Sequence, residues 1–389
     1  MHLLRVQVPD FRGLKNIDIT FEKDFSPKIF PLGSQNGGGK STLLQLIFVL
    51  LHCSVDEDKK PFLQNMLHDF KISEEEDKRI LAIIDIWDGE EIINLEFFCK
   101  KVSFLEHIIG DSEEELDFLD CHAIDEDINP ETILDIGGIS KLKKRFSYDG
   151  KIVVFTRLQC CFNNKDMGKS KLFLDNISSK IFLAAPSTQV FLFLPQDSRK
   201  LLFKNLTNGD NYYSILESVK DKLPCLFTYD FLAVELLVKS FKYAVECDFR
   251  AMIKTGSYGN SYQTLINDLN LLLGNKKINV NEDFSGVNFH LDNNGETIEL
   301  YPEDLSHGEL KRLSIYIWLK SRNIEDAIVL MDEVEIAFHP DWQYQIISDL
   351  KEWAPSNQYI LATHSYALCE ALTPAHVKEI EPKLIKQEL

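Results

Sequence analysis

The stretch from Ala327 to Met331 is an unbroken apolar run that ends in two adjacent acids, Asp332 and Glu333. Such a run is typical of a strand in a parallel sheet, because other elements cover both faces of that sheet. The carboxyl ends of these strands meet at the edge of an open α/β sheet where ligands bind. We therefore expect an α/β fold that carries one carboxylate for a metal ion and another to polarise a water molecule.

A glycine-rich loop lies near the other end of the sequence, between the strand-like run Lys28 to Leu32 and the apolar run Leu43 to Leu51. Backbone N–H groups of small residues at a helix N-terminus can surround a phosphate group. Lys40 would supply a positive charge, and the Ser41 hydroxyl would join the Mg²⁺ shell. The residues expected to bind a nucleotide here are Asn36, Gly37, Gly38, Gly39, Lys40, Ser41 and Thr42.

The loop departs from the usual G-x-x-x-x-G-K spacing, because Ser34 stands six residues before Lys40 and the glycine is Gly33. Serine is small, but it adopts a positive φ less readily than glycine does. The alternative is a glycine-rich turn that precedes a lysine by coincidence, and the acidic strand weighs against it. We therefore predict a phosphate-binding loop whose entry turn differs from the usual one.

A third motif, Leu305 to Glu309, precedes the amphipathic run Leu310 to Leu319. It resembles the signature motif of ABC-type ATPases, since Ser306, Gly308 and Glu309 match and His307 departs from the usual glycine. In that family the motif opens a helix whose N-terminus points at the γ-phosphate bound by a second subunit. The resemblance implies ATP and Mg²⁺ as cofactors and a homodimer with composite ATP sites.

Together the motifs resemble the SMC-like, RecF-like branch of the ABC superfamily, which includes Septu-like and overcoming-lysogenisation-type ATPases of bacterial antiphage defence and DNA repair. The segment Leu3 to Leu14 resembles the strand and Phe-Arg turn that open those proteins, and Asp332 to Pro340 resembles their acidic strand and D-loop. Thr363-His364-Ser365 corresponds to their switch histidine. The matched motifs cover roughly the first 55 and the last 90 residues.

The resemblance also assigns roles to single residues. Glu333 would act as general base, His364 would sense the γ-phosphate and Lys40 would stabilise charge. By the same resemblance Arg12 would approach the nucleotide, and the alternative is a core aromatic, Phe11, followed by a surface arginine. Ser41, Asp332 and a Q-loop glutamine would hold Mg²⁺. The candidate for that glutamine is Gln196, at the end of a predicted buried strand from Val190, with Gln189 and Gln159 as rivals.

The expected fold is an α/β, ABC-type P-loop NTPase head in two lobes. Residues 1–200 and 326–389 would form lobe I, a mixed core sheet flanked by helices with an antiparallel β subdomain. Residues 201–325 would form a helical lobe II that carries the signature motif. In lobe I, Asp88-Gly89-Glu90 is a hairpin signal between strand-like runs 79–87 and 91–98. An acidic insertion would occupy about 105–150, as a mobile loop rather than a docking site for a basic partner.

Helices are expected between Asp210 and Asn275, broken near Pro224 and Gly256, and this tract lacks the sustained heptads of long coiled-coil arms. Eight cysteines occur without a C-x-x-C pair, which indicates reduced thiols in a cytoplasm rather than disulfides or zinc. The start of the sequence does not resemble a signal peptide, and the run around Leu43 to Cys53 is too short to cross a bilayer. We therefore expect a cytoplasmic head without a membrane anchor.

The net charge of −19 disfavours DNA contact by this chain alone. Its densest basic cluster, Lys141 to Arg145, is better explained as a solvated face than as a phosphate-binding patch. Because the sequence ends 25 residues after His364, an effector nuclease would be a separate protein. The function hypothesis is an ATPase whose head dimerisation regulates such an effector; the alternatives are the nucleotide-binding subunit of a transporter and a switch module that binds ATP without hydrolysing it.

Overall fold

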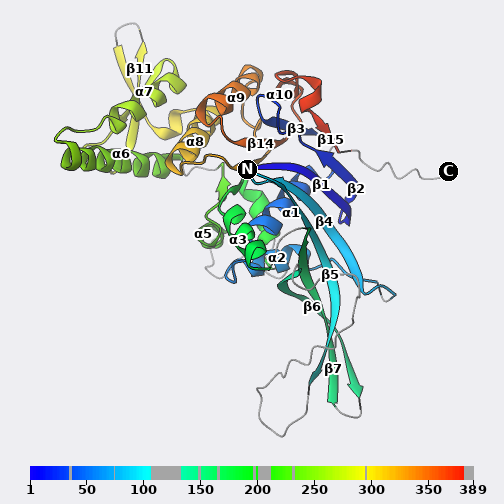
Figure 1. Cartoon of the computed structure of the whole chain (residues 1–389). Helices are drawn as coiled ribbons and strands as arrows, with labels where there is room; N and C mark the ends of the chain where they lie inside the picture. Colours follow the sequence, from blue (N-terminus) through cyan, green and yellow to red (C-terminus); the bar gives the residue numbers. More distant parts are fainter. Residues whose placement is uncertain are drawn as a thin grey trace.

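The computed structural model describes residues 1–34, 37–73, 75–106, 133–147, 150–163, 167–195, 199, 212–229, 233–293 and 296–380. Side chains are described throughout these ranges except in parts of β5, β6 and β7 and at single positions elsewhere. The described residues form a mixed α/β structure with a six-stranded parallel core sheet, a six-stranded antiparallel sheet with longer strands, and a three-stranded sheet (Figure 1).

The core sheet has the strand order β15-β3-β14-β13-β8-β9, and its neighbouring strands are parallel. Its strands are β3 (Ile29–Gly33), β8 (Ile181–Ala185), β9 (Leu226–Thr228), β13 (Ile328–Asp332), β14 (Gln358–Ala362) and β15 (Lys378–Glu379). Every residue of β13 and β14 is buried, which explains the continuous apolar runs in their sequences. The predicted acidic strand is confirmed, and it ends at the same sheet edge as the strand before the glycine-rich loop.

The antiparallel sheet has the order β2-β1-β4-β5-β7-β6. Its strands are β1 (His2–Phe11), β2 (Leu14–Thr20), β4 (Lys78–Trp87), β5 (Ile92–Glu106), β6 (Ile133–Ser147) and β7 (Gly150–Phe162). The predicted hairpin joins β4 to β5, with Gly89 at a φ of 121°. The long strands β5, β6 and β7 extend away from the core in Figure 1. The predicted insertion at 105–150 therefore contains a regular strand, β6, and its residues 107–132 and 148–149 lie outside the described residues.

Helix α1 (Lys40–His52) packs against both the core sheet and α3 (Met167–Ser178), and all its residues from Leu43 onward are buried. A helix that is apolar on every side must be covered on every side, and here one hydrophobic core joins it to the antiparallel sheet. Helix α2 (Lys60–Leu67) packs against α1, and α5 (Tyr212–Lys222) packs against the segment Ser187–Phe193. The glycine-rich loop is thus followed by a rigidly held helix.

A second hydrophobic core lies on the other side of the core sheet. Its elements include α6 (Ala233–Thr255), α7 (Ser261–Leu273), α8 (His307–Ser321), α9 (Pro340–Trp353), α10 (Tyr366–Glu370) and the sheet β10 (Lys276–Val280), β11 (Val287–Asn293) and β12 (Glu296–Leu300). Helices α6 and α7 project from the body of the molecule in Figure 1. β9 lies inside the predicted lobe II range of 201–325 but pairs with β8 of the core sheet, and the division into lobes stays a prediction.

The segment from Val190 is not a strand, and this part of the prediction was wrong. Residues Ser187–Phe193 form a 3₁₀ helix, η2. The strand position beside β13 is taken by β8, which ends just before Pro186. Val190, Phe193 and Leu194 are buried at a helical spacing, and a short apolar run does not distinguish a strand from a buried helical turn.

Among the residues that the structure describes, none of the helices has both the length and the apolar character that a membrane span requires.

Candidate active site

The glycine-rich loop turns into α1 through two left-handed glycines, Gly37 with a φ of 80° and Gly39 with a φ of 89°. A Cβ on Gly39 would lie 2.5 Å from Leu14 Cδ2, so both the backbone conformation and the packing require glycine there. Gly39 caps α1 without a side-chain hydrogen bond, and the first turn has no acidic residue. The helix therefore begins with N–H groups that can bind an anion. Asn36, also predicted to bind the nucleotide, lies outside the described residues.

Lys40 is the first residue of α1 and is only 6% exposed. Its Nζ donates to the carbonyl oxygen of Ser34 at 3.2 Å and to the Ser34 hydroxyl at 3.1 Å. Ser34, the residue that departs from the usual loop spacing, thus accepts hydrogen bonds from Lys40. Nζ also lies 3.0 Å from Nε2 of His364, 324 residues away. Burial lowers the pKa of Lys40, and nearby carboxylates oppose that shift. The fold thus brings the predicted lysine and switch histidine into contact.

Ser41 and Asp332 also meet, since the Ser41 hydroxyl donates to Asp332 Oδ1 at 3.1 Å. Asp332 is 2% exposed, and its Oδ2 has no hydrogen-bond partner among the described residues. Burial raises the pKa of Asp332 to about 6, and the negative charges of Glu333 and Glu335 act in the same direction. A buried carboxylate oxygen that lacks a partner, beside a hydroxyl, suits a hard cation such as Mg²⁺, which prefers oxygen ligands.

Glu333 begins the turn that follows β13, and it has a φ of 51°. A non-glycine residue in this region costs on the order of 1–3 kcal/mol, so the surroundings must hold it there. Its N–H donates to the carbonyl oxygen of Ala362 at 2.9 Å, which ties the turn to the end of β14. The half-buried Glu333 therefore stands at the sheet edge, directly after the carboxylate that suits the metal ion.

Glu335 belongs to the same site, although the sequence motifs did not single it out. Its Oε1 accepts the backbone N–H of His364 at 2.7 Å. The side chain is 8% exposed, and Oε2 has no hydrogen-bond partner in the described part of the chain. The available signal was a third acid two residues after Glu333. Glu335 fixes the backbone that carries His364.

The signature residues form a separate cluster at the start of α8. Ser306 caps this helix by accepting the N–H of Glu309 at 3.2 Å, and Glu309 Oε2 accepts the N–H of Ser306 at 2.8 Å. Lys276 holds the Glu309 carboxylate at 2.7 Å. A Cβ on Gly308 would lie 2.7 Å from the carbonyl oxygen of Ala337. Glu309, predicted to bind nucleotide, thus builds its own helix start, and this helix packs on the turn that begins at Glu333.

Arg12 is exposed, follows the buried Phe11, and has a φ of 53°. Its Nη2 donates to the carbonyl oxygen of Met66 at 2.7 Å, and its guanidinium lies 5.3 Å from the Phe11 ring centroid. These contacts anchor the Phe-Arg turn to the end of α2. They agree with the alternative of a core aromatic beside a surface arginine, and the nucleotide role of Arg12 stays a prediction.

The predicted Q-loop residue, Gln196, lies outside the described residues, whereas both of its rivals are described. Gln189 in η2 accepts a hydrogen bond from Gln45 Nε2 at 2.7 Å. Gln45 is 1% exposed and stands one helical turn after Ser41 on α1. Gln159 lies on β7 of the antiparallel sheet, opposite Phe98. Of these two rivals, Gln189 is the one held beside the helix that carries the predicted Mg²⁺ serine.

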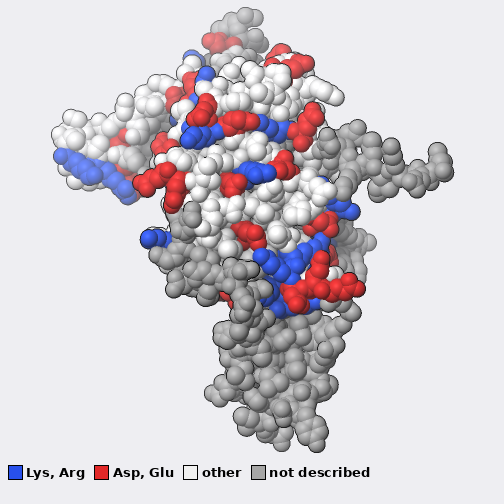
Figure 2. All heavy atoms as spheres, turned by 45° about the vertical axis from the view of Figure 1, so that its right-hand side comes forward, with Lys and Arg blue, Asp and Glu red and all other residues white. Residues whose placement is uncertain are grey.

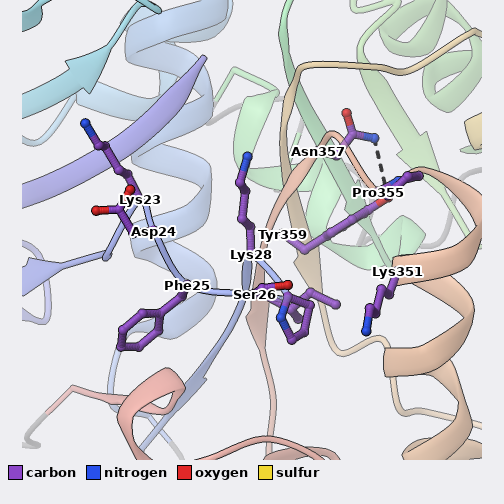
Figure 3. Close-up of a pocket in the computed structure, with 11 residues that line it drawn as sticks. Lys23, Asp24, Phe25, Ser26, Lys28, Lys351, Pro355, Asn357 and Tyr359 are labelled. Carbon is purple, nitrogen blue, oxygen red and sulfur yellow. Dashed lines mark hydrogen bonds between the residues drawn. The ribbon is translucent and has the colours of Figure 1, made fainter.

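A pocket of about 410 Å³ lies at the opposite edge of the core sheet, where β3 and β14 begin. Three lysines contribute to it, and in Figure 3 Lys23 and Lys28 extend upward at separate places while Lys351 extends downward. Lys28 Nζ lies 3.0 Å from His2 Nε2, and Lys23 Nζ lies 4.0 Å from the centroid of the Trp87 ring. The lysines therefore do not converge on one ligand, and the candidate active site is the edge that carries Asp332.

A family model described as "AAA domain, putative AbiEii toxin, Type IV TA system" matches residues 162–370, more than half of the sequence. The chain belongs to this AAA-domain family. The matched range includes the signature helix, the acidic strand and His364, and it begins after the glycine-rich loop. This match supports the predicted class of ATPase domain. The assignment to the SMC-like, RecF-like branch stays a prediction.

A curated relative, "Retron Vc95 probable ATPase" of Vibrio cholerae serotype O1 biovar El Tor, is 31% identical over 106 residues. The match spans 23% of this chain and only 20% of that relative.

Among solved structures, an SMC head bound to the C-winged helix domain of ScpA is 12% identical, with a TM-score of 0.44 and coverage of 95% of this chain and 92% of that one. The SMC head of Thermotoga maritima is 11% identical, with a TM-score of 0.43 and the same coverage. At these values the likeness is too loose to assign a role to any residue of the AAA-domain chain.

Proposed function

We propose that this protein binds MgATP and hydrolyses it at composite sites between two copies of the chain. The observation that carries the proposal is the meeting of Lys40, Ser41, Asp332 and His364 at one edge of the core sheet. These residues come from three distant segments of the sequence, and each has the chemistry that phosphoryl transfer to water requires.

In the proposed mechanism, the N–H groups at the start of α1 and the Lys40 ammonium bind the β- and γ-phosphates. Ser41 and Asp332 would hold Mg²⁺, and the bound ion would neutralise phosphate charge. Gln189, which is hydrogen-bonded to Gln45 on α1, is our candidate for the Q-loop glutamine. Glu333 accepts the proton of the attacking water, and His364 contacts the γ-phosphate. Catalysis then consists mainly of positioning and charge stabilisation.

The proposed dimer is supported by the position of the signature residues at the start of a helix. Ser306 and Gly308 lie at the start of α8, where they contact Glu309 and the turn after β13. A helix start of this kind favours an anion. In the proposed closed state, α8 of one copy covers the γ-phosphate bound to the other copy, so ATP binding favours the closed dimer over the open monomers.

We further propose that this closure regulates a separate effector, such as a nuclease, in bacterial antiphage defence or DNA repair. The family's description as part of a Type IV TA system and the retron relative support a defence role with partner components. Acidic side chains are interspersed with basic ones over the face shown in Figure 2. The net charge of −19 over the whole sequence, rather than this mixed face, favours a basic protein partner over direct contact with DNA.

The test combines two measurements on purified protein. Phosphate release per subunit should rise with protein concentration, because a monomer has only half of each site. The Glu333→Gln variant should bind MgATP, shift from monomer to dimer in light scattering, and release phosphate at least a hundredfold more slowly. A rate per subunit that is independent of concentration, in a protein that stays monomeric with MgATP, would refute the composite site.

A further inference from the structure

The turn after β13 is strained at two places. Glu333 has a φ of 51° and Ala337 a φ of 71°, and neither is glycine. Each such residue costs on the order of 1–3 kcal/mol, so the turn persists only because neighbouring groups hold it. The position of the Glu333 carboxylate depends on those groups.

Helix α8 provides them from its first two turns. Lys311 Nζ donates to the carbonyl oxygen of Glu333 at 3.0 Å and to that of Ile336 at 3.1 Å. One turn earlier, Gly308 lies so close to Ala337 that a Cβ would reach its carbonyl oxygen at 2.7 Å. The helix that begins with the signature residues is thus fixed to both ends of the strained turn.

Lys311 itself is 5% exposed, which is unusual for a lysine. Its ammonium lies 3.9 Å from the ring centroid of Tyr229 and beside a pocket of about 330 Å³ whose lining includes Pro186 and Leu310. Burial lowers the pKa of Lys311 to about 7, against the raising effect of the carboxylates of Glu335, Glu333 and Asp332. Burying a cation is costly unless it is paired and hydrogen-bonded. An apolar side chain would fill the same space without that cost, so the lysine indicates a role for its hydrogen bonds.

We infer that Lys311 is a positioning residue for hydrolysis: it holds the Glu333 turn in its strained conformation and joins it to the signature helix of the same subunit. When α8 moves onto the nucleotide of the other copy, the general base of its own subunit moves with it. Closure at one composite site would thereby set the base at the other. The inference rests on the proposed ATPase function and adds coupling between the two sites.

The experiment measures kcat, KM and MgATP affinity for Lys311→Met, with Lys320→Met as a matched control on an exposed part of the same helix. Lys311→Met should lower kcat by about tenfold to a hundredfold, the range typical of a misplaced catalytic group, while KM and MgATP affinity stay within threefold. Lys311→Arg, which keeps charged donors, should recover at least a third of the wild-type kcat. The Lys320→Met control should match the wild type.

If Lys311→Met does not fold, Lys311→Gln carries the same expectation, since its amide is too short to reach both carbonyl oxygens. A wild-type kcat in these variants would overturn the inference. So would equal losses in kcat and MgATP affinity, which would indicate general disruption of the site. Absence of hydrolysis by the wild-type dimer would instead refute the proposed function.

Discussion

The buried ammonium of Lys311 makes a prediction about stability that does not depend on nucleotide. Its pKa falls from 10.5 to about 7 in the folded chain, because burial disfavours the charged form. Between these values the unfolded chain binds a proton that the folded chain does not, so the free energy of unfolding rises with pH. The penalty is complete below about pH 7 and disappears above the unfolded pKa. Each pH unit in this window changes stability by about 1.4 kcal/mol.

The test compares wild-type protein with Lys311→Met by denaturant unfolding at several pH values. From pH 7.5 to 9.5 the wild type should gain about 2–3 kcal/mol relative to the variant, and the comparison cancels the titration of other groups. The control variant is Lys320→Met, which removes an exposed lysine of the same helix. A constant difference between wild type and Lys311→Met over this range would refute the reasoning, because it would mean that the Lys311 ammonium is as well solvated in the fold as in water.

Three further predictions concern the site itself. Gly39→Ala combines a left-handed φ with a Cβ contact of 2.5 Å, so ATP affinity by calorimetry should fall at least tenfold; a change below threefold would contradict this role. Asp332→Asn should abolish the Mg²⁺ dependence of ATP binding, and it should raise the melting temperature of the free protein because it removes a buried charge. ATP titrations with Mg²⁺ and with EDTA test the first expectation, and persistent Mg²⁺ dependence would count against the metal site. Glu335→Ala removes the acceptor of the His364 N–H, so kcat should fall about tenfold. The free energy of unfolding should change by no more than about 2 kcal/mol. A kcat equal to that of the wild type would show that Glu335 is dispensable.

The sequence was sufficient for features that rest on local patterns. The buried strand that ends at Asp332, the helix after Gly39 and the helix capped by Ser306 each follow from apolar runs, glycine or capping residues next to one another. The 3₁₀ helix η2 was missed because the apolar run from Val190 fits a strand and a buried helical turn equally well. Gln196 and Asn36 lie outside the described residues, so their assignments stay predictions.

Other features depend on contacts between distant segments and have no local signal. Lys311 acquires its role from carbonyl oxygens 22 and 25 residues further along the sequence, and a lysine on a helix is ordinarily read as a solvated residue. Glu335 acquires its role from the N–H of His364, 29 residues away. The fold decides both roles, because it sets β13 beside β14 and lays α8 across the turn.

The strand order of the core sheet also constrains the stage of synthesis at which this sheet can form. β3, which leads into the glycine-rich loop, lies between β14 and β15, and both of these strands come from the last part of the described chain. A nascent chain that has not yet produced residues 358–379 offers β3 no neighbour in its own sheet. Such long-range pairing is slow to form. We therefore expect the glycine-rich loop to reach its final position only after the acidic strand and the signature helix have been synthesised.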